Sequence, residues 1–343
     1  MYEILRNAKQ WLRGGAAVLL ALLLCAGVWA NAATVTEDAG ASTARMLVPV
    51  GHTVGIKLFA RGVVVVKLND GGTPAKACGL QTGDVIVKCA GSAVTSTEQF
   101  QALLQKSGGD TTDLQVQRQG DPVTLTVEPT RNDQGVYCIG AWIRDSMAGI
   151  GTMTYYDPAT GEFGALGHGI TDVETAQLMP FANGSILPST VKAVKKGECG
   201  CAGELRGDFD LTGDLGDLYA NTNGGVFGTL DAEDYAPVLS EAVPTGEATS
   251  GPATIRSNVQ GDTVEEYEIE IVKVISDASD GRDMVMSVTA PDLLAITGGI
   301  VQGMSGSPIL QDGKLVGAVT HVLLNDPTKG YGISIETMLD AGS

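Results

Sequence analysis

Residues 297–308 read TGGIVQGMSGSP, and this stretch decides how the rest of the sequence is interpreted. A serine is a weak nucleophile until the backbone presents it to a base and leaves neighbouring N–H groups free for an oxyanion. The glycines around Ser305 allow such a turn, and the N–H groups of Gly303 and Ser305 would point into one small space. Ser307 is the competing hydroxyl, and a glycine-rich turn with an idle serine is the competing structure. The stretch favours Ser305 as a nucleophile, with Gly303 and Ser305 as oxyanion donors.

The search for a base is short, because the chain contains only three histidines, His52, His168 and His321. His168 stands in a glycine-flanked turn well upstream of Ser305. The order histidine then serine is that of chymotrypsin-like proteases, whose Gly-Asp-Ser-Gly-Gly-Pro loop residues 303–308 resemble. We therefore predict that His168 is the general base. His321 follows the serine on an apolar run, and we expect it to border the substrate pocket.

The orienting carboxylate is open at this point. Asp292 lies just upstream of the serine loop, and Asp172, Asp208 and Asp210 are other candidates. Many acidic side chains in a chain with 40 Asp and Glu residues must simply be solvated. Asp292 is retained as the predicted third catalytic residue.

The second part of the chain has the rhythm of a β-barrel or sandwich. Glycine is abundant at 46 residues, and short apolar runs are separated by Gly, Asp and Asn turns. These runs are 147–155, 184–193, 266–275, 284–288, 314–322 and 332–335. We predict a mostly β protein in which residues 135–343 form a β-barrel serine protease domain.

The first part resembles a PDZ domain. Residues 73–80 (TPAKACGL) and 83–86 (GDVI) match the conserved core of that family, and Thr95 with Glu98 predicts a capped helix. The resemblance implies a small α+β PDZ domain at residues 46–130. It also implies that a peptide adds as a strand beside Val54-Gly55-Ile56-Lys57-Leu58. The alternative is a PDZ fold used only for internal packing.

The N-terminus has the composition of an export signal. Three basic residues precede an apolar run at 14–30, and Ala30-Asn31-Ala32 offers a signal-peptidase pattern. We predict a signal peptide or membrane anchor at residues 1–32, which would give the protein membrane contact, and a linker at 33–45. The exported remainder is either released by cleavage or stays tethered.

The net charge and the absence of certain motifs limit the kinds of ligand that the sequence predicts. The formal net charge is −18, so nucleic acid is not expected to bind. No nucleotide, flavin or metal motif is present, so we predict no cofactor and no metal. The five cysteines after the leader cannot all pair internally, and Cys199-Gly200-Cys201 is better explained by a surface loop of thiols than by a metal site.

Longer strings resemble the stage IV sporulation protein B peptidases of endospore-forming bacteria. They are residues 167–172 (GHGITD), the stretch 297–308, and 320–322 (THV) followed by 325–328 (NDPT) and 330–332 (GYG). The resemblance implies a PDZ domain followed by a chymotrypsin-like serine protease, secreted from the forespore into the space between its two membranes. There it would cleave itself and a membrane-associated regulatory protein that restrains sigma-factor processing. In that family the acid directly follows a Val-Thr pair, where this chain has Ala290, and Asp292 stands two residues later.

Two other functions stay open. The alanine at position 290 is compatible with an inactive PDZ and protease-fold scaffold that only binds its partners. A quality-control protease of the HtrA type is the other possibility. The domain order argues against the second, because those proteins place the protease before the PDZ domain.

Overall fold

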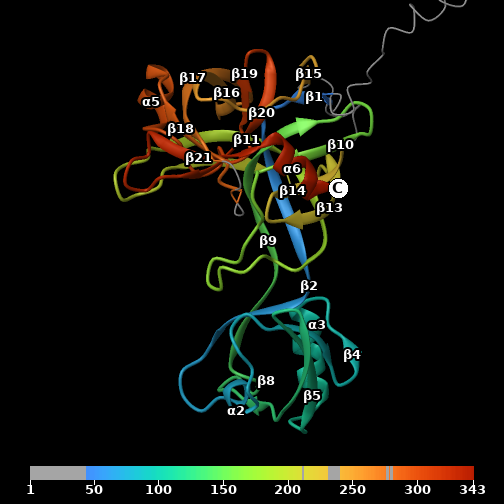
Figure 1. The fold of residues 1–343 in the computed structure, drawn as a ribbon. Coiled ribbons are helices and arrows are strands. Elements are labelled where there is room, and N and C mark those ends of the chain that lie inside the picture. The colour runs from blue at the N-terminus through green and yellow to red at the C-terminus, as the bar shows by residue number, and fades with distance from the viewer. Residues whose placement is uncertain (1–43, 211, 231–239, 276–277, 279–280) are drawn as a thin grey trace, which may run out of the picture. The chain divides into compact units, whose positions relative to one another are not determined.

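The computed structural model describes residues 44–210, 212–230, 240–275, 278 and 281–343 (Figure 1). The predicted export segment and nearly all of the predicted linker lie outside these residues. Within the described ranges, no helix is long and apolar enough to cross a bilayer.

The first barrel is a ring of strands in which each is hydrogen-bonded to the next. The ring runs β9, β10, β14, β13, β11 and β2, and β2 pairs again with β9. Their bounds are β2 Thr53–Leu68, β9 Ala141–Tyr156, β10 Glu162–Ala165, β11 Phe181–Lys195, β13 Gly216–Thr222 and β14 Gly225–Leu230. Three further strands extend the sheet, β1 Met46–Pro49, β12 Glu204–Phe209 and β15 Val243–Pro244. Buried Val54, Ile56, Met153 and Phe163 fill the interior.

The second barrel is closed by six strands in the order β16-β17-β18-β21-β20-β19, coloured orange to red in Figure 1. Their bounds are β16 Gly251–Gln260, β17 Thr263–Val274, β18 Met284–Val288, β19 Pro308–Gln311, β20 Lys314–Val322 and β21 Lys329–Ser334. Helices α5 (Pro291–Thr297) and α6 (Ile335–Gly342) complete this half. The predicted runs 284–288 and 314–322 coincide with β18, where buried side chains alternate with partly buried ones, and with β20, which is buried from Leu315 to Thr320. The mostly β protease domain is confirmed.

The PDZ domain is built around a separate core of Val63, Ile86, Phe100 and Leu114. Its elements are the second half of β2, α2 (Pro74–Ala77), β3 (Val85–Cys89), β4 (Ser92–Ala93), α3 (Thr97–Lys106), β5 (Thr112–Arg118), β6 (Asp121–Val127) and the start of β9. A short hairpin of β7 (Thr130–Arg131) and β8 (Tyr137–Cys138) follows β6.

The predicted helix cap in this domain is displaced by one residue. Helix α3 is capped by Ser96, whose side chain accepts a hydrogen bond from the Gln99 N–H, whereas the expected cap was Thr95 with Glu98. Thr95 instead donates its N–H to the Gln99 side chain at 2.7 Å. Serine and threonine are both good caps, so the sequence alone did not separate these neighbours.

The PDZ domain is inserted into the first barrel. Residues 53–59 of β2 pair with 146–152 of β9 in the barrel, and residues 64–68 of β2 pair with 141–144 of β9 in the PDZ domain. The two long strands therefore belong to both domains. Residues 53–59, predicted to belong to the PDZ domain, pair within the protease barrel, and residues 141–144, predicted to belong to the protease domain, pair within the PDZ sheet.

This topology also corrects the predicted peptide groove. Val54, Gly55, Ile56, Lys57 and Leu58 pair with β11 on one side and with β9 on the other. Gly55, for example, lies opposite both Leu187 and Ile150. Strand addition requires a free edge, and this segment has none. The prediction that a peptide adds beside residues 54–58 is wrong.

Candidate active site

The serine loop has the backbone shape that its glycines predict. Gly303 and Gly306 have φ angles of 98° and 97°, a region that favours glycine. A side chain at Gly306 would overlap the carbonyl oxygen of Thr152. Within the described residues, neither the Gly303 nor the Ser305 N–H donates a hydrogen bond. Both donors are therefore available to an oxygen atom that binds beside Ser305.

His168 follows β10 in a tight turn. Leu166 and Gly167 before it have φ angles of 69° and 67°. The His168 Nδ1 atom lies 3.0 Å from the carbonyl oxygen of Gly169. Because a carbonyl only accepts, Nδ1 carries the proton and Nε2 is left as an acceptor. Burial lowers the pKa of His168, since it disfavours the cation, so the imidazole is neutral at pH 7.

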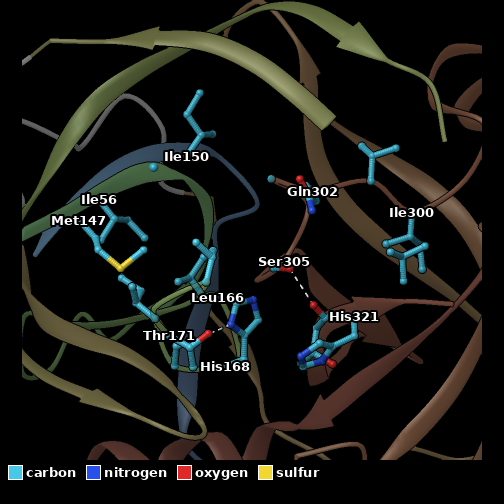
Figure 2. A pocket seen from close by; sticks show the side chains of 18 of the residues that line it. Ile56, Met147, Ile150, Leu166, His168, Thr171, Ile300, Gln302, Ser305 and His321 are labelled. Carbon is cyan, nitrogen blue, oxygen red and sulfur yellow. Dashed lines mark hydrogen bonds between the residues drawn. The ribbon is translucent and has the colours of Figure 1, made fainter. Parts of the chain in front are cut away.

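One cavity brings three of the predicted residues together. Ser305, His168 and His321 all line a cavity of about 460 Å³, with Gly303 at its wall (Figure 2). The ring centroids of His168 and His321 are 5.1 Å apart. His168 comes from the first barrel, and Ser305 and His321 come from the second. The cavity therefore lies where the two barrels meet.

The Ser305 hydroxyl is turned toward the backbone in this structure. Its Oγ donates to the carbonyl oxygen of Thr320 at 2.7 Å, as the dashed line in Figure 2 shows. The proton is therefore not directed at His168. The hydroxyl must turn away from Thr320 before it can donate to the imidazole.

The structure does not bring Asp292 to this cavity. Asp292 lies exposed in the first turn of α5, and its Oδ1 accepts from the Leu293 N–H at 2.9 Å. A carboxylate at this position interacts favourably with the positive end of the helix. The Nδ1 atom of His168 pairs with Gly169 instead. This placement does not support Asp292 as the residue that orients His168, and that assignment stays a prediction.

The other acidic candidates also have different roles. Asp172 is buried, pairs with Arg144, and accepts from the N–H groups of Glu174 and Thr175. Asp208 lies in β12, and Asp210 accepts hydrogen bonds from Thr212. None of the three is among the residues that line the cavity. Asp172 acts on the loop that follows His168, by fixing its turn.

Thr152 is a site residue that sequence reasoning missed. This fully buried residue of β9 donates its N–H to the Ser305 carbonyl at 3.0 Å and its hydroxyl to the Gly303 carbonyl at 2.7 Å. Its own carbonyl accepts from the Leu166 N–H at 3.1 Å. Thr152 therefore joins the serine loop to the histidine loop. A threonine inside an apolar strand run is the only signal that the sequence offers.

Comparisons with known proteins extend over both domains. The family model of the SpoIVB peptidase S55 matches residues 135–339, and a PDZ domain model matches residues 37–128. The candidate zinc metalloprotease CPE1693 of Clostridium perfringens is 32% identical over 68 residues, 20% of this chain and 20% of its own length. The chain thus spans about a fifth of the length of that curated relative.

Solved structures resemble parts of the chain. The PDZ domain of the SdrC-like protein Lmo2051 from Listeria monocytogenes is 25% identical over 24% of this chain and 87% of its own, with a TM-score of 0.22. The active form of the Rv3671c protease from M. tuberculosis is 12% identical over 57% of this chain and 73% of its own, with a TM-score of 0.32. Because the peptidase model matches more than half of the chain, the protein belongs to the SpoIVB peptidase S55 family, and it also carries a PDZ domain.

Proposed function

We propose that this chain is a sporulation signalling endopeptidase in which Ser305 attacks the peptide carbonyl and His168 is the general base. The observation that carries the proposal is the shared cavity, where Ser305, a neutral His168 and the undonated N–H groups of Gly303 and Ser305 converge. A serine, a base and two fixed donors are the parts that acyl transfer requires.

The proposed reaction has two halves. After the Ser305 hydroxyl rotates away from Thr320, His168 Nε2 takes its proton while Oγ bonds to the peptide carbon. The carbonyl oxygen becomes negative and is held by the N–H groups of Gly303 and Ser305. The carbon–nitrogen bond then breaks, and His168 gives the proton to the departing amine. Water releases the acyl group by the same steps, with His168 again accepting and then returning a proton.

In this scheme the Gly169 carbonyl takes the place of an orienting carboxylate. Its bond to Nδ1 supports the tautomer that leaves Nε2 free to accept. A neutral carbonyl stabilises the imidazolium less than a carboxylate would. We therefore propose a serine–histidine pair that turns over more slowly than a full triad.

The cellular role is proposed from the family. Substrates would include the chain itself and a membrane-associated regulatory protein that restrains sigma-factor processing. The sequence of residues 1–32 supports export, and the family supports the space between the forespore membranes. Because the PDZ domain shares β2 and β9 with the catalytic barrel, a ligand of that domain would act on strands that line the cavity.

Self-cleavage of the full chain tests this proposal. The parent, Ser305→Ala and Ser307→Ala would be expressed with the N-terminal segment in place and followed by gel and mass spectrometry. Ser307 is the matched control, because it is a buried neighbour whose hydroxyl lies 3.1 Å from Ser257. We expect cleavage in the parent and in Ser307→Ala, and none in Ser305→Ala. Cleavage that persists in a folded Ser305→Ala protein would contradict the proposal.

A further inference from the structure

We propose that this peptidase selects an uncharged, apolar side chain on the substrate residue whose carbonyl Ser305 attacks. This inference rests on the proposed function of Ser305. The cavity beside Ser305 has mainly aliphatic walls (Figure 2). They are formed by Ile56, Met147, Ile150, Leu166, Ile170 and Val322.

The absence of charge in the cavity contrasts with the rest of the molecule. The chain has 40 acidic and 22 basic residues, yet none of the described residues that line the cavity is Asp, Glu, Lys or Arg. A cavity that binds a lysine or arginine side chain needs a fixed carboxylate, and one that binds an acidic side chain needs a fixed cation. The walls offer neither.

The position of the oxyanion donors decides which substrate residue enters. The attacked carbonyl oxygen must lie at the N–H groups of Gly303 and Ser305. Its own residue then lies against the segments that border Ser305, which are 300–303 and 320–322. Both segments line the cavity, so the side chain next to the attacked carbonyl is the one that the cavity receives.

Desolvation supplies the selectivity. A charged side chain that enters this cavity loses water and meets no Asp, Glu, Lys or Arg side chain among the described residues of the lining. His168 does not compensate a carboxylate, because its lowered pKa keeps it neutral. An aliphatic or aromatic side chain instead removes apolar surface from water on both sides. Differences of this kind change specificity by about tenfold or more.

Gln302 provides a way to alter the charge without rebuilding the wall. Its side chain is exposed and lies beside Ser305 in Figure 2. Its backbone is held independently, by bonds from its N–H to Gly203 and from the Leu205 N–H to its carbonyl. Gln302→Glu therefore places a carboxylate of nearly the same size at the cavity, and Gln302→Met is the neutral control.

The test measures inactivation rates of the full chain by one set of tetrapeptidyl diphenyl phosphonates. The probes differ only in the side chain beside phosphorus, which matches Leu, Phe, Lys or Glu. We expect the Leu and Phe probes to react at least about tenfold faster than the Lys and Glu probes. Gln302→Glu should raise the rate of the Lys probe about threefold to tenfold, and Gln302→Met should not.

A simple fluorophosphonate without a peptide tests the nucleophilic role of Ser305 separately from the apolar preference of the cavity. If it labels Ser305 but the Lys or Glu probe reacts as fast as the Leu probe, the apolar preference is wrong. If it does not label Ser305 in the folded protein, the proposed function fails and the preference falls with it.

Discussion

The Thr152 N–H donates to the Ser305 carbonyl at 3.0 Å, so a strand of the first barrel holds the serine loop of the second. The same residue donates its hydroxyl to the Gly303 carbonyl at 2.7 Å. These two bonds hold the peptide units 303–304 and 305–306, which flank the unit that carries the Ser305 N–H, and so restrain the loop that carries both proposed oxyanion donors. The catalytic geometry thus depends on a buried threonine that does not itself touch the substrate.

Replacing Thr152 tests this positioning role. Thr152→Val keeps the side-chain volume but removes the bond to Gly303, and we expect kcat to fall about tenfold to a hundredfold with little change in KM. The partly buried Gly303 carbonyl would also lose its partner, which should cost about 1 kcal/mol of stability. Thr152→Ser keeps the hydroxyl and should retain kcat within about threefold. A folded Thr152→Val protein with the parent kcat would contradict the role.

The glycine after the serine should be irreplaceable for a steric reason. Gly306→Ala places a methyl group on the Thr152 carbonyl oxygen, whereas Gly313→Ala, at a φ of 74°, meets no atom within 4 Å. Both changes strain a left-handed backbone, at a cost of about 1 kcal/mol. Only Gly306→Ala should also abolish fluorophosphonate labelling and lower the melting temperature further. If both variants lose labelling and melting temperature equally, backbone strain, and not the contact with Thr152, causes the destabilisation.

The lowered pKa of His168 predicts the acid limb of the activity profile. We expect kcat/KM to rise with pH and to level off with a midpoint below the usual histidine value of about 6.5, since the free base is the active form. The free energy of unfolding also falls at low pH. Between the usual histidine pKa and the lowered pKa of folded His168, the unfolded chain binds a proton that the folded chain does not bind. Stability should therefore be constant above about pH 6.5 and decline as the pH falls toward the folded pKa.

His52 supplies the control for this profile. Its pKa is also lowered by burial, but it does not line the cavity. His52→Gln should change how stability depends on pH and leave the midpoint of kcat/KM in place. A midpoint that moves in His52→Gln would contradict the assignment to His168.

Replacing Asp292 and replacing Asp172 should have different effects on activity and stability. Asp292→Asn should keep kcat/KM within about threefold, because the exposed Asp292 carboxylate accepts a hydrogen bond within its own helix turn and does not line the cavity. Asp172→Asn weakens the pair with Arg144 and the turn after His168, and should cost about 1–3 kcal/mol of stability together with activity. Paired thermal melts and kinetics check both. A loss of a hundredfold or more in Asp292→Asn, without a change in melting temperature, would restore Asp292 as the orienting acid.

Local sequence signals predicted the elements that depend on local geometry. The glycines around Ser305 and His168 require particular backbone angles, so the two loops could be recognised, and the short apolar runs 284–288 and 314–322, bounded by turn residues, identified barrel strands. The structure then placed Ser305, His168 and His321 around one cavity.

Pairing between distant segments could not be predicted in the same way. Residues 54–58 were expected to be a strand, and they are, but both partners come from more than 80 residues away. A strand pattern specifies which side chains are buried and does not specify which strands lie beside it. For the same reason the sequence did not predict the insertion of the PDZ domain, the contact of Thr152 with Gly303, or the position of Asp292 outside the cavity lining.

Peptide mass spectrometry of the adduct formed by a fluorophosphonate probe would identify the nucleophile directly. The full-length parent and His168→Ala would be treated at the same pH, after circular dichroism has shown that both are folded. We expect a single adduct on Ser305 in the parent, with labelling reduced at least about a hundredfold in His168→Ala. An adduct on Ser307, or undiminished labelling of Ser305 without His168, would contradict it.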